Sequence, residues 1–334
     1  MALAVSHTFA DQETLTHTLL NAIETNIVNN ALALINPLTG DLAAGDNDIT
    51  GIGELAFTDT DADASATGYL RRTNQHLEWH DATGSWPLQP LVGGAIFGLT
   101  ISNNGTDATN DIDVAVGQAV DDTEVEVLRL TSALTKRLDA AWAVGTNAGM
   151  LDTGVIANDA YHIFLIKRED TGVTDILASA SLSPTMPTSY TLKRRIGSIL
   201  RESAALVAFT QDGDYFRRSV AILDIDVSGT QSAAVSRTLS VPTEVSVHAL
   251  FNARFVPSAA NFVYYFSDLD STDAAPSISV APLGDQAADA IADHGWHCVR
   301  TSTSAAIRSR TNDSGSHTLR IATWGWWDPR GRNS

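Results

Sequence analysis

The chain has 334 residues, of which 39 are acidic and 21 basic, so its formal net charge at pH 7 is −18. Such a charge repels nucleic-acid phosphates and argues against a general DNA- or RNA-binding protein. Hydrophobic residues make up 44% of the sequence, but no apolar run approaches the roughly 18–20 residues of a membrane span, so we expect no membrane insertion. The first residues, MALAVSHTFADQ, lack the basic and apolar regions of a signal peptide, so we expect no export by the standard secretory route.

Residues 1–34 are predicted to contain a short coiled-coil helix. Asp11 can cap its N-terminus, and core positions then recur at alternating spacings of four and three residues. Isoleucine at both core positions favours three strands over two, and one buried asparagine can fix the register. A helix docked on its own globular domain is the alternative. The predicted seam consists of Thr16, Leu20, Ile23, Ile27, Asn30 and Leu34.

Residues 35–88 contain isolated apolar residues separated by glycines and aspartates. Within one chain, such residues cannot bury enough surface to offset backbone ordering, which costs about 1–2 kcal/mol per residue. The segment is therefore either disordered or packed against identical copies of itself, and a symmetric assembly provides the shared core. We interpret it as a thin trimeric shaft, with further trimer contacts at Leu38, Leu42, Ile49 and Ile52.

Residues 89–227 have the pattern of a compact β domain. The apolar runs 161–167 and 173–178 flank an Asp-Thr-Gly turn and predict a hairpin. The segment 130–145 is compatible either with a helix over residues 133–142 or with a strand. Further strands are predicted at 195–201, 206–210 and 215–218.

Residues 228–334 are predicted to form a C-terminal β-sandwich that begins at a Ser-Gly-Thr-Gln break. Between Val245 and Phe255, apolar residues alternate with mainly polar ones, which is typical of a strand with one buried face. The unit of about 105 residues has the size and strand spacing of a sandwich. Further strands are predicted at 262–267, 305–310 and 318–327.

Four short patterns resemble known sites but lack their context. Residues 51–56 match G-x-G-x-x-A without the preceding strand of a dinucleotide site. Residues 59–63 begin like a calcium loop, but the glycine and glutamate of an EF-hand are missing. The histidines in 76–80 lack the glutamate spacing of a zinc-protease helix, and His294, His297 and Cys298 lack a fourth ligand. We expect no cofactor and no metal, although a metal on a trimer axis and a looser calcium site stay open.

Nothing in the sequence indicates a catalytic nucleophile. The pattern G-x-S-x-G does not occur, and the single cysteine, Cys298, has no recognisable catalytic setting. A carboxylate pair for glycoside cleavage can be identified only by geometry. We therefore predict no enzymatic activity and no catalytic residues.

The C-terminal end combines tryptophans with arginines. Residues 300–334 contain six arginines and two aspartates, a local charge of +4. Tryptophan faces stack on sugar rings, and arginine forks bind carboxylate or sulfate. One alternative is that the first two tryptophans lie in the core, with Trp327 exposed. The other is that the arginines pair with acidic neighbours. The candidate receptor-binding residues are Trp324, Trp326, Trp327, Arg320, Arg330 and Arg332.

The stretches TLTHTLLNAIETNIVNN and LTGDLAAGDNDITGIGELAF resemble the start of tailed-bacteriophage fibre proteins, in which a short helix precedes a recurring shaft element. Gly40, Leu42, Ile49 and Ile52 match that element. The middle, including GLTISNNGTDATNDIDVAVGQA and YHIFLIKREDTG, is similar to a module in predicted tail or fibre proteins of phages and prophages of alphaproteobacteria. The resemblance implies a homotrimeric fibre or spike, attached by its N-terminal end, whose distal β domains contact the host surface. It brings no catalytic residues.

We therefore predict a mainly β, elongated homotrimeric phage tail fibre with an attachment and trimerisation helix, a thin shaft and two distal β domains. Its partners would be other virion proteins at the N-terminal end and a host surface polysaccharide at the C-terminal end. It would be located on the virion, on the tail in preference to the head, after assembly in the host cytoplasm. One alternative is a head-attached fibre or capsid decoration protein. The other is a polysaccharide-degrading spike enzyme, but the sequence lacks the long repetitive β-helix of such enzymes. The predicted domains are residues 1–34, 35–88, 89–227 and 228–334.

Overall fold

The computed structural model describes residues 69–73, 76–81, 84–87, 93–124, 126–277, 285–286 and 293–332. All helices and strands that could be assigned in these residues are β-strands, and this confirms the prediction of a mainly β protein. The chain divides into two compact units, Met1–Leu88 and Gln89–Ser334. The predicted helix seam and trimer contacts, from Thr16 to Ile52, lie outside the described residues. No helix long and apolar enough to cross a membrane occurs in the described part of the chain.

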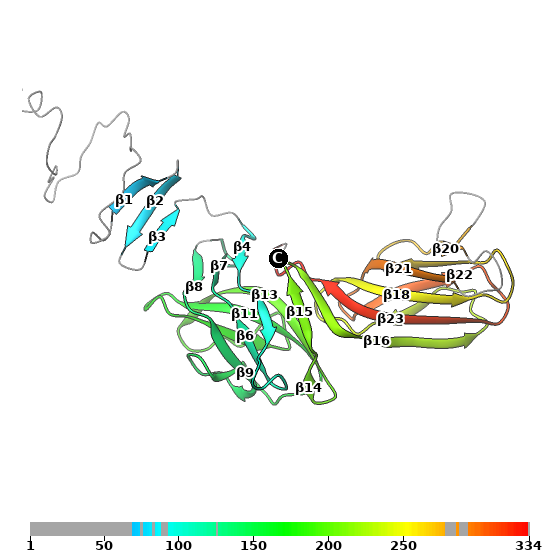
Figure 1. Ribbon diagram of the computed structural model, residues 1–334, viewed down its shortest axis with the longest axis horizontal. Coiled ribbons are helices and arrows are strands. Elements are labelled where there is room, and N and C mark those ends of the chain that lie inside the picture. Colours follow the sequence, from blue (N-terminus) through cyan, green and yellow to red (C-terminus); the bar gives the residue numbers. More distant parts are fainter. Residues whose placement is uncertain are drawn as a thin grey trace, which may run out of the picture. The chain divides into compact units, whose positions relative to one another are not determined.

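In the first unit, the described backbone forms a small antiparallel sheet (Figure 1). Its order is β1-β2-β3, and consecutive strands pair with each other. The strands are β1 (Tyr69–Thr73), β2 (His76–Asp81) and β3 (Gly84–Pro87). The motif at 76–80 is therefore part of a strand.

The second unit begins with a large mixed sheet and a smaller sheet, which we call the mixed-sheet lobe (residues 93–206). In the large sheet, β10 pairs in parallel with both β9 and β12, and the other pairs are antiparallel. In sheet order the strands are β14 (Ala205–Leu206), β13 (Tyr190–Glu202), β11 (Ala160–Arg168), β12 (Thr174–Ser179), β10 (Ala148–Leu151), β9 (Leu134–Ala141), β6 (Asp111–Val114) and β5 (Ile101–Asn103). The smaller sheet consists of β4 (Ile96–Gly98), β7 (Gly117–Val120) and β8 (Val127–Leu130).

The predicted hairpin at 161–178 is confirmed as the antiparallel pair β11 and β12. Every residue of β11 from Ala160 to Ile166 is buried, because the sheet is covered on both faces. One face contributes Ile163 and Leu165 to the main core, while the other carries Phe164 and Ile166 in a second apolar cluster. Burial on both faces explains why residues 163–166 of this strand are all apolar.

The second part of this unit, residues 209–327, is a pair of packed sheets that we call the sandwich lobe. Figure 1 shows its long strands running side by side. The five-stranded sheet has the order β15 (Phe209–Asp212), β16 (Tyr215–Gly229), β23 (His317–Trp327), β18 (His248–Val256) and β21 (Asp293–Arg300). The four-stranded sheet has the order β17 (Val235–Thr238), β22 (Ala306–Thr311), β19 (Val263–Ser267) and β20 (Asp285–Gln286). The predicted boundary between residues 227 and 228 falls near the end of β16.

Aromatic side chains hold the two sheets of the sandwich lobe together. Phe251 meets Phe266 with ring centroids 5.2 Å apart, and Phe255 meets Tyr264 at 4.7 Å, both edge to face. Edge-to-face contacts at these distances are favourable for aromatic rings. Because residues 249, 251, 253 and 255 all point into this core, the alternate residues of β18 are left on the opposite face of the sheet. That opposite face is where the candidate site lies.

Candidate functional site

The outward residues of β16, β23, β18 and β21 form one surface, which we call the outer face. Burial alternates along β18 and β21, so every second residue points away from the sandwich core. Strand register places these residues in rows across the sheet. Three rows are Tyr215, Trp327, His248 and Arg300; Leu223, Ala322, Asn252 and Trp296; and Asp226, Arg320, Arg254 and His294.

Four aromatic rings form two contacts on the outer face. Trp296 and Trp324 have ring centroids 5.5 Å apart with a 50° tilt, and 60% of Trp296 is exposed. Trp327 stacks on Tyr215 at 5.0 Å, and 47% of Trp327 is exposed. Large exposed apolar side chains gathered on one surface are typical of a binding site. The outer face therefore offers ring surfaces to a ligand.

The outer face is basic, although the chain as a whole is acidic. The described outward residues of its strands include one aspartate, Asp226, and four arginines. The Arg217 guanidinium lies 5.9 Å from the Trp324 ring centroid, a distance at which a cation is attracted to the ring. The Arg320–Asp226 pair is exposed on both sides and so contributes little to stability. The four arginines are Arg217, Arg254, Arg300 and Arg320.

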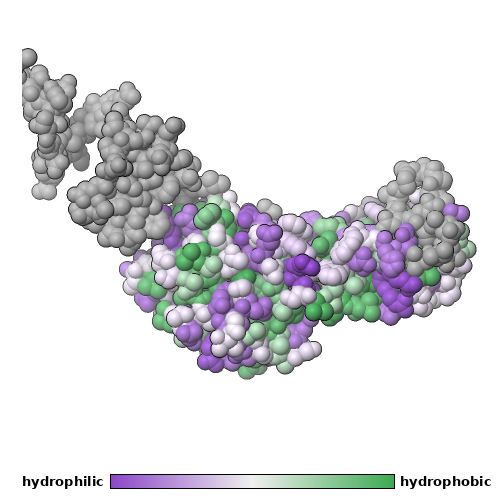
Figure 2. All heavy atoms as spheres, in the orientation of Figure 1, coloured by the Kyte–Doolittle hydropathy of each residue, from purple (hydrophilic) through white to green (hydrophobic). Residues whose placement is uncertain are grey.

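Hydrophobic and hydrophilic residues are separated along this part of the molecule. Figure 2 shows hydrophobic residues gathered where β16 and β23 run in Figure 1, beside a hydrophilic group nearer the end of β16. The strand register agrees, because the row with Leu223 and Trp296 lies beside the row with Arg320 and Arg254. Apolar and cationic surface thus adjoin on one sheet.

Trp326, which the sequence suggested as a receptor-binding residue, is fully buried. Its ring is parallel to that of Phe216, with an interplanar angle of 3° and centroids 5.6 Å apart. Its neighbour Gly325 permits close strand pairing, since a Cβ there would lie 2.2 Å from the Phe216 carbonyl oxygen. Trp326 therefore belongs to the core and cannot contact a ligand on the surface.

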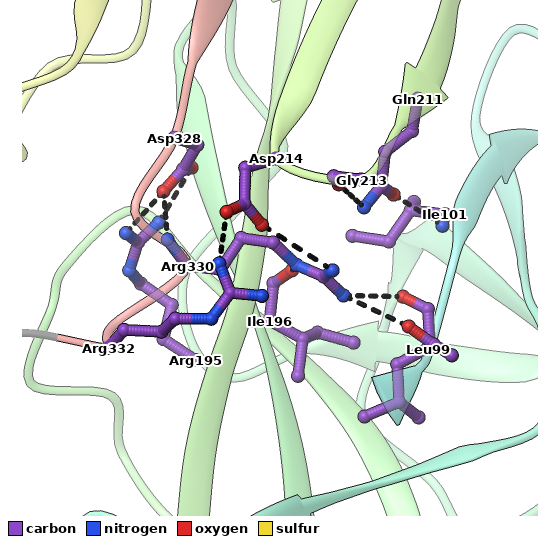
Figure 3. A network of polar contacts seen from close by, with 11 residues as sticks. Leu99, Ile101, Arg195, Ile196, Gln211, Gly213, Asp214, Asp328, Arg330 and Arg332 are labelled. Atoms are coloured by element: carbon purple, nitrogen blue, oxygen red, sulfur yellow. Dashed lines mark hydrogen bonds and ion pairs between the residues drawn. The ribbon is translucent and has the colours of Figure 1, made fainter. Parts of the chain in front are cut away.

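Arg330, another candidate, is also buried and is 3% exposed. Its Nε donates to the Ile196 carbonyl at 2.7 Å, and its Nη2 donates to the Leu99 carbonyl at 3.0 Å (Figure 3). Arg332, further along, is partly exposed and forms an ion pair with Asp214. Arg330 thus attaches the segment after β23 to the mixed-sheet lobe, whereas Arg332 pairs with the turn between β15 and β16 in the sandwich lobe. The prediction that Arg330 binds the receptor is therefore wrong, because its guanidinium is buried and bonded to backbone carbonyls.

A buried ion pair lies next to Arg330. Arg195 donates two hydrogen bonds to Asp328, at 2.8 and 2.5 Å (Figure 3). Burial alone would raise the pKa of Asp328, but Arg195 and the backbone N–H of Arg330 outweigh it and hold the pKa below its usual value. Arg195 also donates to Ser198 Oγ, which lies 2.9 Å from His162 Nδ1. Burial, together with the charge of Arg195, lowers the pKa of His162 to about 4.

Sequence reasoning missed Trp296 and Arg254. It treated residues 294–298 as a weak metal cluster, whereas the alternation of β21 places His294 and Cys298 outward and His297 inward. His297 stacks on Phe251 at 5.3 Å, so these three groups do not converge. Among the described residues, no group of three side chains could hold a metal ion. The sequence DHGWHCVR of β21 does not alternate between apolar and polar residues, so the outward position of Trp296 follows only from the pairing of β21 with β18.

Comparisons with known proteins do not identify a family. No protein-family model matches the chain, and no curated protein matches it. A structure of the T13 particle of infectious bursal disease virus shares 12% identity over 79% of this chain and 63% of that one, with a TM-score of 0.21. A subviral particle of VP2 from the same virus gives 14% identity, 77% and 66% coverage and a TM-score of 0.20. A Cry1Da tryptic core variant of Bacillus thuringiensis shares 10% identity over 68% of this chain and 51% of that one, with a TM-score of 0.18. These scores are too low to carry an argument about fold or function.

Proposed function

We propose that this protein is a structural and adhesive virion protein, a homotrimeric phage tail fibre that binds an anionic host-surface polysaccharide. The observation that carries the proposal is the outer face, where exposed tryptophans adjoin arginines on an acidic chain. The sequence resemblance to phage fibre proteins supports the virion assignment. The N-terminal region would attach to the virion, and the sandwich lobe would contact the host.

The outer face suits a polymer chain better than a small ligand, because its side chains are distributed over four strands of an open sheet. The Trp296 and Trp324 rings would stack on the C–H faces of sugar rings. Arg217 and Arg254 would bind carboxylate or sulfate groups along the chain, as arginine forks do. Repeated weak contacts by three copies would add to a firm attachment. Trp324 and Trp327 therefore stay in the proposed site, and Trp296 and Arg254 take the place of the buried Trp326 and Arg330.

The proposal is tested by measuring the affinity of the full chain for immobilised alginate, a polyuronate, and for neutral dextran. We expect alginate to bind and dextran to bind less. The double variant Trp296→Ala with Trp324→Ala should weaken alginate binding by about tenfold or more, because it removes both exposed rings of one contact. Arg254→Gln should weaken binding and reduce its dependence on salt, since a screened charge interaction is lost.

Matched controls come from the mixed-sheet lobe. Phe97 is 76% exposed, and Phe97→Ala removes an exposed aromatic ring outside the outer face. Arg137, with 47% of its side chain exposed, provides Arg137→Gln. If these controls reduce binding as much as the outer-face variants do, or if neither polymer binds, the proposed glycan face is wrong. Electron microscopy of gold-labelled antibodies on the virion then tests tail attachment, and label on the head would support the head-fibre alternative.

A further inference from the structure

A cavity of about 340 Å³ lies against the mixed sheet, on the face that carries Phe164. Segments far apart in the sequence line it, including the loop between β12 and β13, the loop before β18 and the C-terminal residues after β23. This volume is within the range of natural small-ligand sites, about 300–1,000 Å³. None of its lining residues belongs to the outer face. Its lining includes Phe164, Leu182, Val245, Asp122, Lys193 and Arg195.

The polar wall of the cavity is held in place by ion pairs. Arg195 is 5% exposed and is fixed by its two hydrogen bonds to Asp328. Lys193 Nζ donates to Asp122 Oδ2 at 2.7 Å, and the two side chains are 30% and 25% exposed. The positions of these groups are set before a ligand arrives, so binding would require little ordering of side chains. The cavity therefore has a preorganised polar side.

The chemistry of the wall favours a ligand with several hydroxyl groups. An ammonium has three N–H donors, and the bond to Asp122 uses one of those on Lys193. A hydroxyl group can accept from Lys193 and donate to Asp122 at the same time. Because each charge already has a partner, the site does not require a charged ligand. Leu182, which is 39% exposed, and the half-buried Val245 supply apolar surface for C–H groups, above the buried Phe164.

We propose that this cavity binds a single pyranose sugar residue. A pyranose has an apolar C–H face and a ring of hydroxyl groups, which are the two kinds of surface that the cavity presents. This inference extends the proposed glycan adhesion to a second site, and the choice of a sugar rests on that function. The outer face would hold an extended chain, while the cavity would hold one residue, such as a chain end or a side branch.

The test uses the full chain and saturation-transfer NMR with methyl glycosides of glucose, galactose, mannose and N-acetylglucosamine. At least one of them should bind. Leu182→Trp, in the partly exposed loop that lines the cavity, should fill the space and weaken that binding by about tenfold or more. Val155→Trp is the matched control, because Val155 is 88% exposed and lies outside the cavity, and it should leave binding unchanged.

A second variant keeps the test decisive if Leu182→Trp disturbs folding. Lys193→Gln removes the ammonium and retains a polar side chain of similar reach. It should weaken the binding of the same glycoside. The inference is wrong if none of the four glycosides binds, or if the folded cavity variants bind as tightly as the unaltered chain. Trp296→Ala with Trp324→Ala should leave glycoside binding unchanged while alginate binding falls, so the failure of one site is distinguishable from the failure of the other.

Discussion

Arg330 connects the end of the chain to the mixed-sheet lobe through backbone carbonyl oxygens. Its guanidinium bonds to Ile196 and Leu99, and Asp214 lies 3.8 Å from its Nη1. Removing the guanidinium leaves these buried carbonyls without a donor, which is costly. We expect Arg330→Met to lower the free energy of unfolding by about 2–4 kcal/mol. Urea denaturation measures this, and Arg137→Met, at an exposed position, should change it by less than about 0.5 kcal/mol. If Arg330→Met and Arg137→Met change the free energy of unfolding equally, Arg330 does not hold the segment after β23 on the mixed-sheet lobe.

His162 makes the stability of the protein depend on pH. Its pKa is about 4 in the folded protein because burial, with the charge of Arg195, disfavours the imidazolium. In the unfolded chain the ordinary value of about 6.5 applies. Between these two values the unfolded state binds more protons, so stability is present above pH 6.5 and is lost as pH falls towards 4. The loss attributable to this group is about 3 kcal/mol at pH 4.

The measurement is urea denaturation at several pH values between 7 and 4. His162→Gln should show a smaller loss of stability over this range than the unaltered chain, since one proton-binding difference has been removed. His248→Gln, at an exposed position on β18, is the control and should retain the full loss. An unchanged pH profile for His162→Gln would contradict the assignment.

At the scale of elements, local sequence patterns predicted the strands whose environment is simple. β18 alternates because one of its faces is buried, and the β11–β12 hairpin follows from two apolar runs around a turn. β9 was ambiguous because its periodicity allowed a helix, and only pairing with β6 and β10, its two neighbours in the sheet, makes it a strand. The parallel position of β10 between β9 and β12 depends on such long-range pairing and has no local signal.

Local sequence patterns predicted the candidate site only in part. Alternation along one strand would place Trp324 and Trp326 on the same face, but Trp326 is buried and Trp324 faces outward. A register shift between Thr323 and Gly325, where β23 pairs with β18, separates the two and leaves Trp327 exposed, and the sequence does not indicate this shift. Trp296 joins Trp324 only because β18 and β23 bring β21 alongside. Arg330 follows the last strand, and nothing in its neighbours indicates that it contacts carbonyls at residues 98, 99 and 196. Contacts between distant segments are the part that sequence patterns do not contain.

At the scale of the whole molecule, the proposed function depends on several copies acting together. The second unit has its own extensive core, so we expect residues 89–334 alone to fold. The sparse apolar residues of 35–88 and the seam at Ile23 and Ile27 predict that the full chain associates as a trimer. Binding by three linked sites can exceed binding by one site by roughly 10²–10⁴-fold on a polymer-coated surface.

The full chain should therefore have the mass of a trimer in light scattering, and residues 89–334 the mass of a monomer. On immobilised alginate the trimer should dissociate at least about a hundredfold more slowly, while both forms bind a single methyl glycoside equally well per subunit. Ile23→Asp with Ile27→Asp should convert the full chain to monomer or aggregate, because charges at both core positions cannot be buried in the seam. The predicted coiled-coil seam is wrong if the full chain is a soluble monomer, or if the trimer persists after the double substitution. Equal dissociation of trimer and monomer would show instead that attachment relies on one strong site, and the weak, repeated contacts assigned to the outer face would then be incorrect.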